Sequence, residues 1–244
     1  MRFADKVVIV TGGAGGIGLS TALRFGREGA RVVVADVDPA KLHAAAATLR
    51  AAGALATAEE CDVATEAEAA RLVDDCMARH GRLDVVVNNA GVMIFKSIED
   101  QEEADVERVL RVDFLGPFWL TKHAFRTCRP GAAIVNVASI HAVQTTPMVA
   151  SYAAAKAALL AFTRAAAIEG KPKGIRVNAV LPGAIETPML RENPNVKSGV
   201  ELLDPLYVGR TEDVAAAIAF LASDDAAFIT GAELRVDGGR LARL

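Results

Sequence analysis

The sequence predicts a doubly wound α/β fold, in which a parallel sheet of about seven strands is covered by helices on both faces. Short runs rich in Val, Ile and Ala alternate with longer helical stretches along the whole chain, which is the order of a βαβ architecture. The short runs are apolar at consecutive positions, as expected for parallel strands buried between two layers of helices. The 244 residues contain no linker, repeat or low-complexity segment, so one domain spanning 1–244 is expected.

The first half of the chain alternates regularly between strand and helix. The expected strands are 6–10, 31–35, 55–60 and 84–88, and the expected helices are 17–28, 39–52 and 65–79. Asp38 is placed to cap the second of these helices, and Gly53 is placed to end it. Thr65, followed by Glu68 three residues later, predicts a capping box on the third helix.

The second half continues the same alternation. Helices are expected at 104–109, 112–126, 152–169 and 212–222, and strands at 133–138, 175–181 and 234–236. The polar segment 188–208 lacks a long apolar helix and is predicted to form a lid over a substrate.

Composition and charge exclude several classes of function. The formal net charge of −3 gives no electrostatic basis for binding nucleic acid or an anionic membrane surface. No stretch reaches the roughly 18 apolar residues of a membrane span, and the first apolar run is too short for a signal peptide, so a cytoplasmic protein is expected. The three cysteines lack C-x-x-C spacing, so unpaired thiols and no metal site are expected.

A glycine-rich loop, Thr11-Gly12-Gly13-Ala14-Gly15-Gly16-Ile17-Gly18, joins the first expected strand to the first helix. Glycines let the backbone turn sharply and approach a pyrophosphate closely, and the helix N-terminus offers free N–H groups and a partial positive charge. The loop therefore predicts a dinucleotide site. Its glycines fit two registers, Gly13-x-Gly15-x-x-Gly18 and Gly12-x-x-x-Gly16-x-Gly18, and spacing alone does not choose between them.

Asp36 predicts the choice of dinucleotide. It ends the second strand, roughly 20 residues after the loop, where a carboxylate can bond the adenosine ribose hydroxyls and repel a 2′-phosphate. No Arg or Lys lies within the loop or directly after Asp36. NAD is therefore favoured over NADP.

Tyr152 and Lys156 are four positions apart and share one face of a predicted helix. An ammonium about 4 Å from a phenol, at an effective dielectric constant of about 20, is worth about 4 kcal/mol, or roughly three pKa units. Lys156 is therefore expected to bring the pKa of Tyr152 near the working pH, so that Tyr152 exchanges a proton with an alcohol or ketone. Ser139 follows the fifth strand, where its hydroxyl can bind the substrate oxygen.

Together these motifs resemble the short-chain dehydrogenase/reductase family from residue 6 to residue 239. The matching motifs are Thr11-Gly12-x-x-x-Gly16-x-Gly18, Asp62-Val63, Asn88-Asn89-Ala90-Gly91, Ser139, Tyr152-x-x-x-Lys156, Pro182-Gly183 with Thr187, and Val236-Asp237-Gly238-Gly239. The resemblance implies a Rossmann fold and the second glycine register.

The resemblance also implies which residues hold the dinucleotide. Besides Asp36, Tyr152 and Lys156, they are Gly12, Gly15, Gly16, Ile17, Gly18, Asp62, Val63, Asn89, Ala90, Gly91, Pro182, Gly183, Ile185 and Thr187. Asp62 and Val63 would contact the adenine, and Lys156 would hold the nicotinamide ribose hydroxyls.

Asp113 is a departure from the family pattern. Arg111-Val112-Asp113-Phe114 stands where the family usually has Asn after Val, in the helix before the fifth strand. The Asn backbone carbonyl helps to hold a water that relays protons to the lysine, and Asp113 keeps that carbonyl. It lacks the amide donors, and a buried carboxylate there is expected to be protonated or paired. Asp113 is retained as the fourth catalytic candidate.

The substrate is expected between segments 91–97, 140–150 and the lid, with His141, Gln144 and Met189 as candidate contacts. The polar lid argues against a bulky sterol or a long acyl chain. Ser139-Ile140-His141 and the run 182–188 are similar to glucose 1-dehydrogenase-like members, which favours a sugar or polyol. A 3-oxoacyl thioester reductase is the alternative.

Family members are commonly tetramers built on two long helices, here 112–126 and 152–169. A homotetramer or homodimer is therefore expected, and the Ala-rich second helix permits close approach. Two other classes are a dinucleotide-binding protein without chemistry and an isomerase or dehydratase that uses transient oxidation. Intact Ser139, Tyr152 and Lys156 favour an alcohol dehydrogenase or ketone reductase over both.

Overall fold

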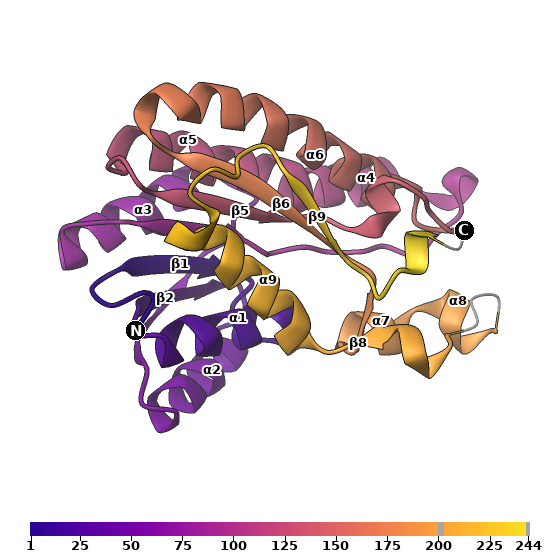
Figure 1. Ribbon diagram of the computed structural model, residues 1–244. Helices are drawn as coiled ribbons and strands as arrows, with labels where there is room; N and C mark the ends of the chain where they lie inside the picture. Colours follow the sequence, from indigo (N-terminus) through magenta and orange to yellow (C-terminus); the bar gives the residue numbers. More distant parts are fainter. Residues whose placement is uncertain (200–202, 243–244) are drawn as a thin grey trace.

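A seven-stranded parallel sheet forms the centre of the protein (Figure 1). The computed structural model describes residues 1–199 and 203–242. The strands are β1 (Val7–Thr11), β2 (Arg31–Asp36), β3 (Leu55–Glu60), β4 (Val85–Asn88), β5 (Ala133–Val137), β6 (Arg176–Pro182) and β9 (Glu233–Val236). Their order in the sheet is β3-β2-β1-β4-β5-β6-β9, which confirms the doubly wound fold. The winding reverses between β1 and β4, and such a reversal forms a ligand crevice at the carboxyl ends of the strands.

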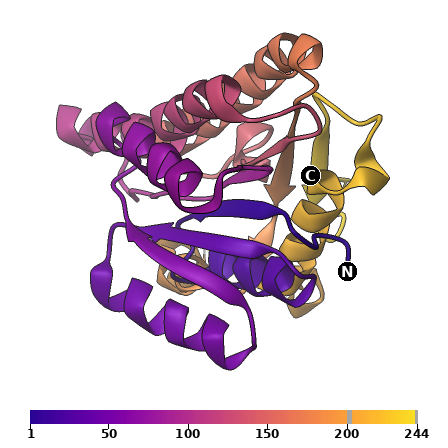
Figure 2. The same cartoon turned by 90° about the vertical axis from the view of Figure 1, so that its left-hand side faces the viewer.

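Helices cover both faces of the sheet (Figure 2). One layer consists of α1 (Gly16–Arg27), α2 (Pro39–Ala51) and α9 (Thr211–Ala222), and the other of α3 (Glu66–His80), α4 (Glu103–Leu110), α5 (Gly116–Thr127) and α6 (Ala150–Gly170). Among the described residues, no helix is long and apolar enough to cross a membrane.

Strand β1 explains why both faces need a helical layer. Val8 and Val10 pack into the core beneath α1 and α9, whereas Val7 and Ile9 pack beneath α3 and α5. Successive side chains of a strand point to opposite faces, so an unbroken apolar run needs cover on both sides.

The two predicted helix caps have different outcomes. The Asp38 carboxylate caps α2 by accepting from the N–H groups of Ala40 (3.0 Å) and Lys41 (3.1 Å), as predicted. The prediction of a capping box on α3 is wrong. Thr65 is the N-cap residue but its side chain caps no N–H group, and the Glu68 carboxylate accepts instead from the Asp62 N–H at 2.7 Å. The chain turns at Asp62, so this N–H faces Glu68.

The two helices predicted on either side of Arg111 are joined without a break. Residues Arg111–Leu115 form a π-helical turn between α4 and α5. A π turn holds an extra residue in the helix, and such turns occur frequently at functional sites. Here the turn buries the side chain of Asp113 completely.

The predicted lid contains two short helices and one strand of a small sheet. Strands β7 (Ala184–Ile185) and β8 (Val208–Gly209) pair in parallel, which the sequence analysis did not predict. Helices α7 (Pro188–Glu192) and α8 (Pro194–Lys197) follow β7 and stand apart from the helical layers (Figure 1). Residues 200–202 of the lid lie outside the described residues, as do 243–244 of the predicted domain.

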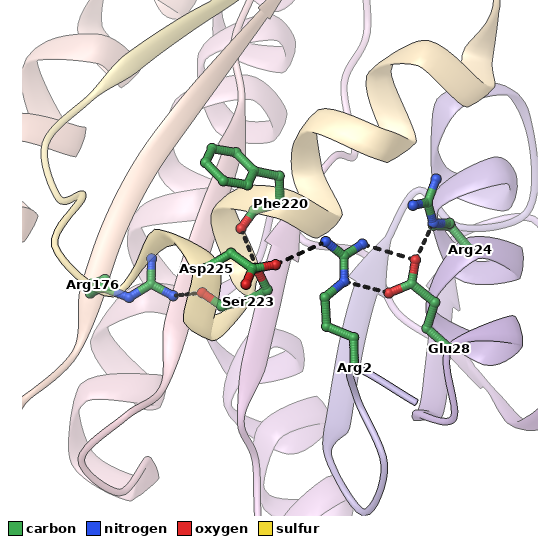
Figure 3. A network of polar contacts seen from close by, with 7 residues as sticks. All are labelled: Arg2, Arg24, Glu28, Arg176, Phe220, Ser223 and Asp225. Carbon is green, nitrogen blue, oxygen red and sulfur yellow. Dashed lines mark hydrogen bonds and ion pairs between the residues drawn. The ribbon is translucent and has the colours of Figure 1, made fainter.

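A polar network fastens the N-terminus to the end of the chain's last long helix (Figure 3). Arg2 donates to both carboxylate oxygens of Glu28, at 2.6 and 2.9 Å, and lies 3.6 Å from the Asp225 carboxylate. Arg176 at the start of β6 donates to the backbone carbonyl of Ser223 at 2.9 Å. These contacts lie at the amino ends of the strands, so the opposite edge of the sheet is left for a ligand.

Candidate active site

A cavity of about 730 Å³ opens where β1, β2, β4, β5 and β6 end, and its size suits a small-molecule site. The predicted residues that line it are Gly12, Gly15, Gly16, Ile17, Asp36, Asp62, Val63, Asn89, Ala90, Gly91, Ser139, His141, Tyr152, Lys156, Pro182, Gly183, Ile185, Thr187 and Met189. Three predicted residues are not part of the lining. Gly18 and Asp113 are buried behind it, and Gln144 is exposed to solvent elsewhere.

The backbone of the glycine loop favours the second of the two registers. Gly12 and Gly16 have φ values of +59° and +49°, in the left-handed region that favours glycine. A Cβ atom at Gly18 would lie 2.1 Å from the Gly12 carbonyl oxygen, so this position has no room for any side chain. Gly15 has an extended φ of −164° and open space where a Cβ would lie. The Gly12-x-x-x-Gly16-x-Gly18 spacing therefore has a structural reason at each of its three glycines.

Asn89 fixes the loop against the end of β4. Its side-chain amide donates to the backbone carbonyls of Thr11 (2.9 Å) and Gly12 (3.0 Å). The Thr11 hydroxyl in turn accepts from the N–H groups of Asn89 and Ala90, at 3.1 and 3.2 Å. These bonds join the first and fourth strands at the crevice and hold the loop in one shape.

The residues present fit the phosphates of a dinucleotide. Helix α1 begins at Gly16 directly under the loop, and its N-cap residue, Gly15, has no side chain to bond the first N–H groups of the helix. Those groups and the helix dipole are therefore available to an anion.

Asp36 lies at the end of β2, where the sequence predicts a contact with the adenosine ribose. Its carboxylate accepts from the N–H groups of Ala14 and Asp38, each at 3.1 Å, which fixes its orientation beside the loop. Lys41, which belongs to no sequence motif, also lines this part of the cavity. Lys41 lies 3.4 Å from the carboxylate of Asp38, so its charge is already matched.

Ser139 follows β5 and has two roles that a sequence pattern cannot separate. Its Oγ accepts from the His141 N–H at 3.1 Å and so caps the short 3₁₀ helix Ile140–Ala142. The same hydroxyl interacts with the phenol of Tyr152, and this interaction opposes the rise in the pKa of Tyr152. The serine thus orients the phenol while capping the turn.

Helix α6 brings Tyr152 and Lys156 to the same wall of the cavity. The Lys156 Nζ atom lies 5.6 Å from the centroid of the Tyr152 ring and donates to the Val137 carbonyl at 2.9 Å. Both side chains are almost fully buried, with exposed fractions of 7% for Tyr152 and 3% for Lys156. Burial of this degree makes the charge on each group sensitive to its neighbours.

The balance of charges around the phenol differs from the prediction made from the sequence. Burial raises the pKa of Tyr152, and the Lys156 ammonium opposes this, as expected. The Asp113 carboxylate acts in the same direction as burial, however, and the pKa of Tyr152 remains above its ordinary value. Lys156 alone therefore does not bring the phenol to neutral pH; the charge of a bound oxidised nicotinamide would act in the same direction as Lys156.

Asp113 lies behind the cavity wall and is paired with Lys156. Its Oδ1 lies 3.0 Å from the Lys156 Nζ atom, and its Oδ2 accepts from the Val92 N–H at 2.9 Å. Burial raises the pKa of Asp113 above its ordinary value, and Lys156 and Val92 oppose that effect only in part. Of the two outcomes expected for a carboxylate at this position, the geometry corresponds to pairing.

The substrate side of the cavity is mostly apolar. His141 and Met189 line it as predicted, with the His141 ring 6.0 Å from the Tyr152 ring. The three segments predicted around the substrate also contribute Val92, Met93, Ile140, Pro188, Leu190 and Asn193 to the lining. Arg240 lines the cavity as well, and it was not predicted because it lies outside those segments and outside every motif.

The other reactive groups do not form a second centre. The described residues contain no cluster of three or more His, Cys, Asp or Glu side chains arranged to hold a metal ion. Cys61 lines the cavity, but burial raises the pKa of its thiol to about 12, which keeps it protonated. Acid/base chemistry at Tyr152 is a chemistry that the arrangement of Ser139, Tyr152 and Lys156 can perform.

A doubly wound sheet that places a glycine loop, a carboxylate at the end of β2 and a buried Tyr–Lys pair around one cavity defines a dinucleotide-dependent oxidoreductase. The family profile described as "Enoyl-(Acyl carrier protein) reductase" matches residues 12–240. The solved structure of a short-chain dehydrogenase/reductase from Serratia marcescens BCRC 10948 superposes with a TM-score of 0.91 at 32% identity, covering 98% of this chain and 99% of that one. The chain belongs to the short-chain dehydrogenase/reductase family, whose members bind a nicotinamide dinucleotide.

Curated relatives match over nearly their whole lengths. Cyclopentanol dehydrogenase from Comamonas sp. (strain NCIMB 9872) is 38% identical over 244 aligned residues, covering 98% of each chain. Cis-4-hydroxycyclohexanecarboxylate dehydrogenase from Sinomonas cyclohexanicum is 42% identical over 242 residues, covering 97% of each chain. As predicted, the protein is an oxidoreductase that acts on the CH–OH group of secondary alcohols.

Proposed function

We propose that the protein is an NAD-dependent dehydrogenase of a compact, largely apolar secondary alcohol, with the hydroxyl on an alicyclic ring, and that it also catalyses the reverse ketone reduction. The proposal depends on one observation: Ser139, Tyr152 and Lys156 meet on the wall of a cavity that also includes the glycine loop and Asp36. This arrangement places an acid/base beside a site for a dinucleotide.

Each of the three side chains has a distinct role in the proposed mechanism. In alcohol oxidation the Tyr152 phenolate accepts the hydroxyl proton, while the carbinol carbon loses its hydride. A bound nicotinamide supplies the hydride acceptor. The Ser139 hydroxyl donates to the substrate oxygen, and the Lys156 ammonium stabilises the phenolate and is placed to hold the nicotinamide ribose. Ketone reduction uses the same groups in reverse, with Tyr152 as the proton donor.

The apolar substrate wall supports an alicyclic alcohol over the sugar or polyol favoured by the sequence. Met93, Ile140 and Leu190 offer no hydrogen bonds to additional hydroxyls, and a hydroxyl buried without a partner is unfavourable. The names of two relatives, cyclopentanol dehydrogenase and cis-4-hydroxycyclohexanecarboxylate dehydrogenase, support the same class of substrate. Arg240 also lines the cavity, so a carboxylate on the ring would meet a cation.

NAD rather than NADP is proposed as the dinucleotide. The Asp36 carboxylate is fixed by two N–H groups and retains lone pairs for two ribose hydroxyls. A 2′-phosphate at the same place would meet this carboxylate, and the charge of the neighbouring Lys41 is matched by Asp38.

A substrate panel followed by NADH absorbance tests the proposal. Cyclopentanol, cyclohexanol and cis-4-hydroxycyclohexanecarboxylate are expected to be oxidised with a higher kcat/KM than glucose or glycerol. Tyr152→Phe is expected to lower kcat by about 10²–10⁴-fold while NADH binding, followed by fluorescence, changes little. Normal turnover by the variant would refute the assignment of Tyr152.

The same panel separates the alternatives. Reduction of acetoacetyl-CoA faster than of cyclopentanone would favour the 3-oxoacyl thioester reductase. NADH binding without turnover of any alcohol or ketone, and with no effect of Tyr152→Phe, would favour a binding protein without chemistry.

Self-association through α6 is part of the proposed function. Its outward face carries exposed small or apolar residues at helical spacing, namely Ala154, Ala157, Ala161, Ala165 and Ile168. Ile168 is 75% exposed. The small side chains of this face, which also carries Arg164, permit close packing against a second copy of the same helix, as in the homotetramer or homodimer expected from the sequence.

A further inference from the structure

The carboxylate of Asp113 is enclosed on every side by the groups that build the site. The residue has 0% exposure, and the π turn Arg111–Leu115 directs its side chain inward. A Cβ atom added at Gly91 would lie 2.8 Å from its Oδ1 and 3.5 Å from the Lys156 Nζ atom. The pair therefore fills the space beneath the cavity wall.

The contacts of Asp113 correspond to its ionised form. Oδ2 accepts the Val92 N–H, and Oδ1 forms an ion pair with the Lys156 ammonium at 3.0 Å. A protonated carboxyl needs an acceptor for its own O–H. Both oxygens face donors instead, so an added proton would have no partner.

The Lys156 ammonium is held at two points. It donates to the Val137 carbonyl at the end of β5 and lies against Asp113 of the π turn. Burial alone would lower the pKa of Lys156, but Asp113 and the Tyr152 phenol oppose this effect and leave the pKa above its ordinary value. The lysine thus stays charged beside Tyr152, but with its charge balanced by a carboxylate.

We propose that Asp113 is a positioning residue whose buried carboxylate is the fixed counter-ion of Lys156, and that it thereby shifts the proton exchange of Tyr152 to more alkaline pH. This inference rests on the proposed function, because it concerns the acid/base assigned there. An asparagine at this position would leave the lysine charge unbalanced.

Few other titratable or charged groups face the Tyr152 phenol. From the 3₁₀ helix after β5 come the Ser139 hydroxyl and the His141 ring, which hydrogen bonds to Thr145 at 3.1 Å. The remaining charged side chains of the cavity lining are Asp36, Lys41, Asp62, Glu107, Arg108, Arg111 and Arg240. Among the charged groups of the described residues, Lys156 and Asp113 shift the pKa of Tyr152, in opposite directions.

The sign of the effect follows from the charges. A negative charge near the phenol disfavours the phenolate, so Asp113 raises the pKa of Tyr152 and Lys156 lowers it. With Asp113 ionised, alcohol oxidation, which needs the phenolate, increases only at high pH. Ketone reduction, which needs the protonated phenol, persists to the same high pH.

Titration of tyrosinate absorbance tests the effect of Asp113 on the pKa of Tyr152 and needs no substrate. The chain has two tyrosines, Tyr152 and Tyr207, so subtracting the curve of Tyr152→Phe isolates Tyr152. In Asp113→Asn, compared with Asp113→Asn/Tyr152→Phe, the midpoint is expected to fall by about one pH unit, a tenfold change in proton concentration. Asp105→Asn is the matched control, because it removes the carboxylate 2.6 Å from Lys96, outside the site. Its midpoint should equal that of the unaltered protein.

Steady-state kinetics add a second measurement. The rise of alcohol oxidation with pH should move to lower pH in Asp113→Asn, and ketone reduction should decline from a lower pH. Unmoved profiles and an unmoved tyrosinate midpoint would overturn the proposal and leave Asp113 a packing residue. If circular dichroism shows that Asp113→Asn is unfolded, the same measurements are made on Asp113→Ser, which has a smaller side chain. Full activity of Tyr152→Phe would refute the proposed function, while the tyrosinate titration would still report on Asp113.

Discussion

Asp36 illustrates how one side chain can select a dinucleotide. Two backbone N–H groups hold its carboxylate in place, so its orientation does not depend on the ligand. Because the carboxylate is already held in place, little conformational entropy is lost when it bonds two ribose hydroxyls. Its charge also repels a phosphate at the same point.

Asp36→Ala is therefore expected to weaken NAD binding at least about tenfold, because each hydrogen bond to a charged group contributes about 1.5–3 kcal/mol. NADP binding should change less or improve, so the ratio of kcat/KM for the two dinucleotides narrows. Asp74→Asn is the control, since it removes an exposed carboxylate on α3 that does not line the cavity. An unchanged preference in Asp36→Ala would show that another group selects the dinucleotide.

At this scale the sequence predicts residue types better than contacts. Tyr152, Lys156 and Ser139 were predicted because their chemistry is unusual at that spacing. Lys41 and Arg240 were missed because no motif includes them and tertiary packing brings them to the cavity. The pairing of Asp113 with Lys156 joins residues 43 positions apart, and only the fold sets that distance.

At the scale of elements, the alternation of strand and helix was predictable because buried parallel strands and Ala-rich helices differ strongly in pattern. The π turn Arg111–Leu115 was not predictable, since its residues have ordinary helix preferences and the extra residue per turn is imposed by packing. The strands β7 and β8 are two residues each, too short to produce a periodic pattern.

The glycine loop and α1 form one unit whose packing can be tested at Gly18. A Cβ atom there would lie 2.1 Å from the Gly12 carbonyl oxygen and 2.6 Å from the Asn89 amide nitrogen. Gly18→Ala must therefore push α1 away from the loop, and we expect a loss of about 1–3 kcal/mol in the free energy of unfolding.

Gly15→Ala is the control for that prediction. It lies in the same loop but has an extended φ and nothing within 4 Å of the added Cβ, so stability should be nearly unchanged. Urea unfolding followed by circular dichroism measures both variants. Equal stability of Gly18→Ala and the unaltered protein would contradict the close packing of loop and helix.

At the scale of the whole molecule, sequence pattern predicts the layers but not their order. The apolar runs require cover on both faces, which fixes a three-layer arrangement. The position of β4 beside β1, and with it the location of the crevice, follows from contacts between distant segments such as Asn89 with Thr11. The network of Arg2 and Glu28 at the other end is likewise a product of the folded chain.

The outward face of α6 is the surface at which two copies of the chain are predicted to meet. The residues that pack inward, such as Ala155 and Leu159, are fully buried, whereas Ala161 on the opposite face is exposed amid other alanines. Ala161→Glu would place a carboxylate at the centre of any contact between two copies of α6, where burying it without a partner is costly. We therefore expect its mass by sedimentation to fall below that of the unaltered protein.

Ala47→Glu provides the comparison, because Ala47 is an equally exposed alanine on α2, outside the predicted interface. Its mass should match that of the unaltered protein, and circular dichroism should show that both variants are folded. If both keep the unaltered mass, assembly uses another surface; if the unaltered protein sediments as a monomer, the alanine face has no partner copy. Dissociation by Ala161→Glu alone would establish that close helix approach, which small side chains permit, joins the subunits.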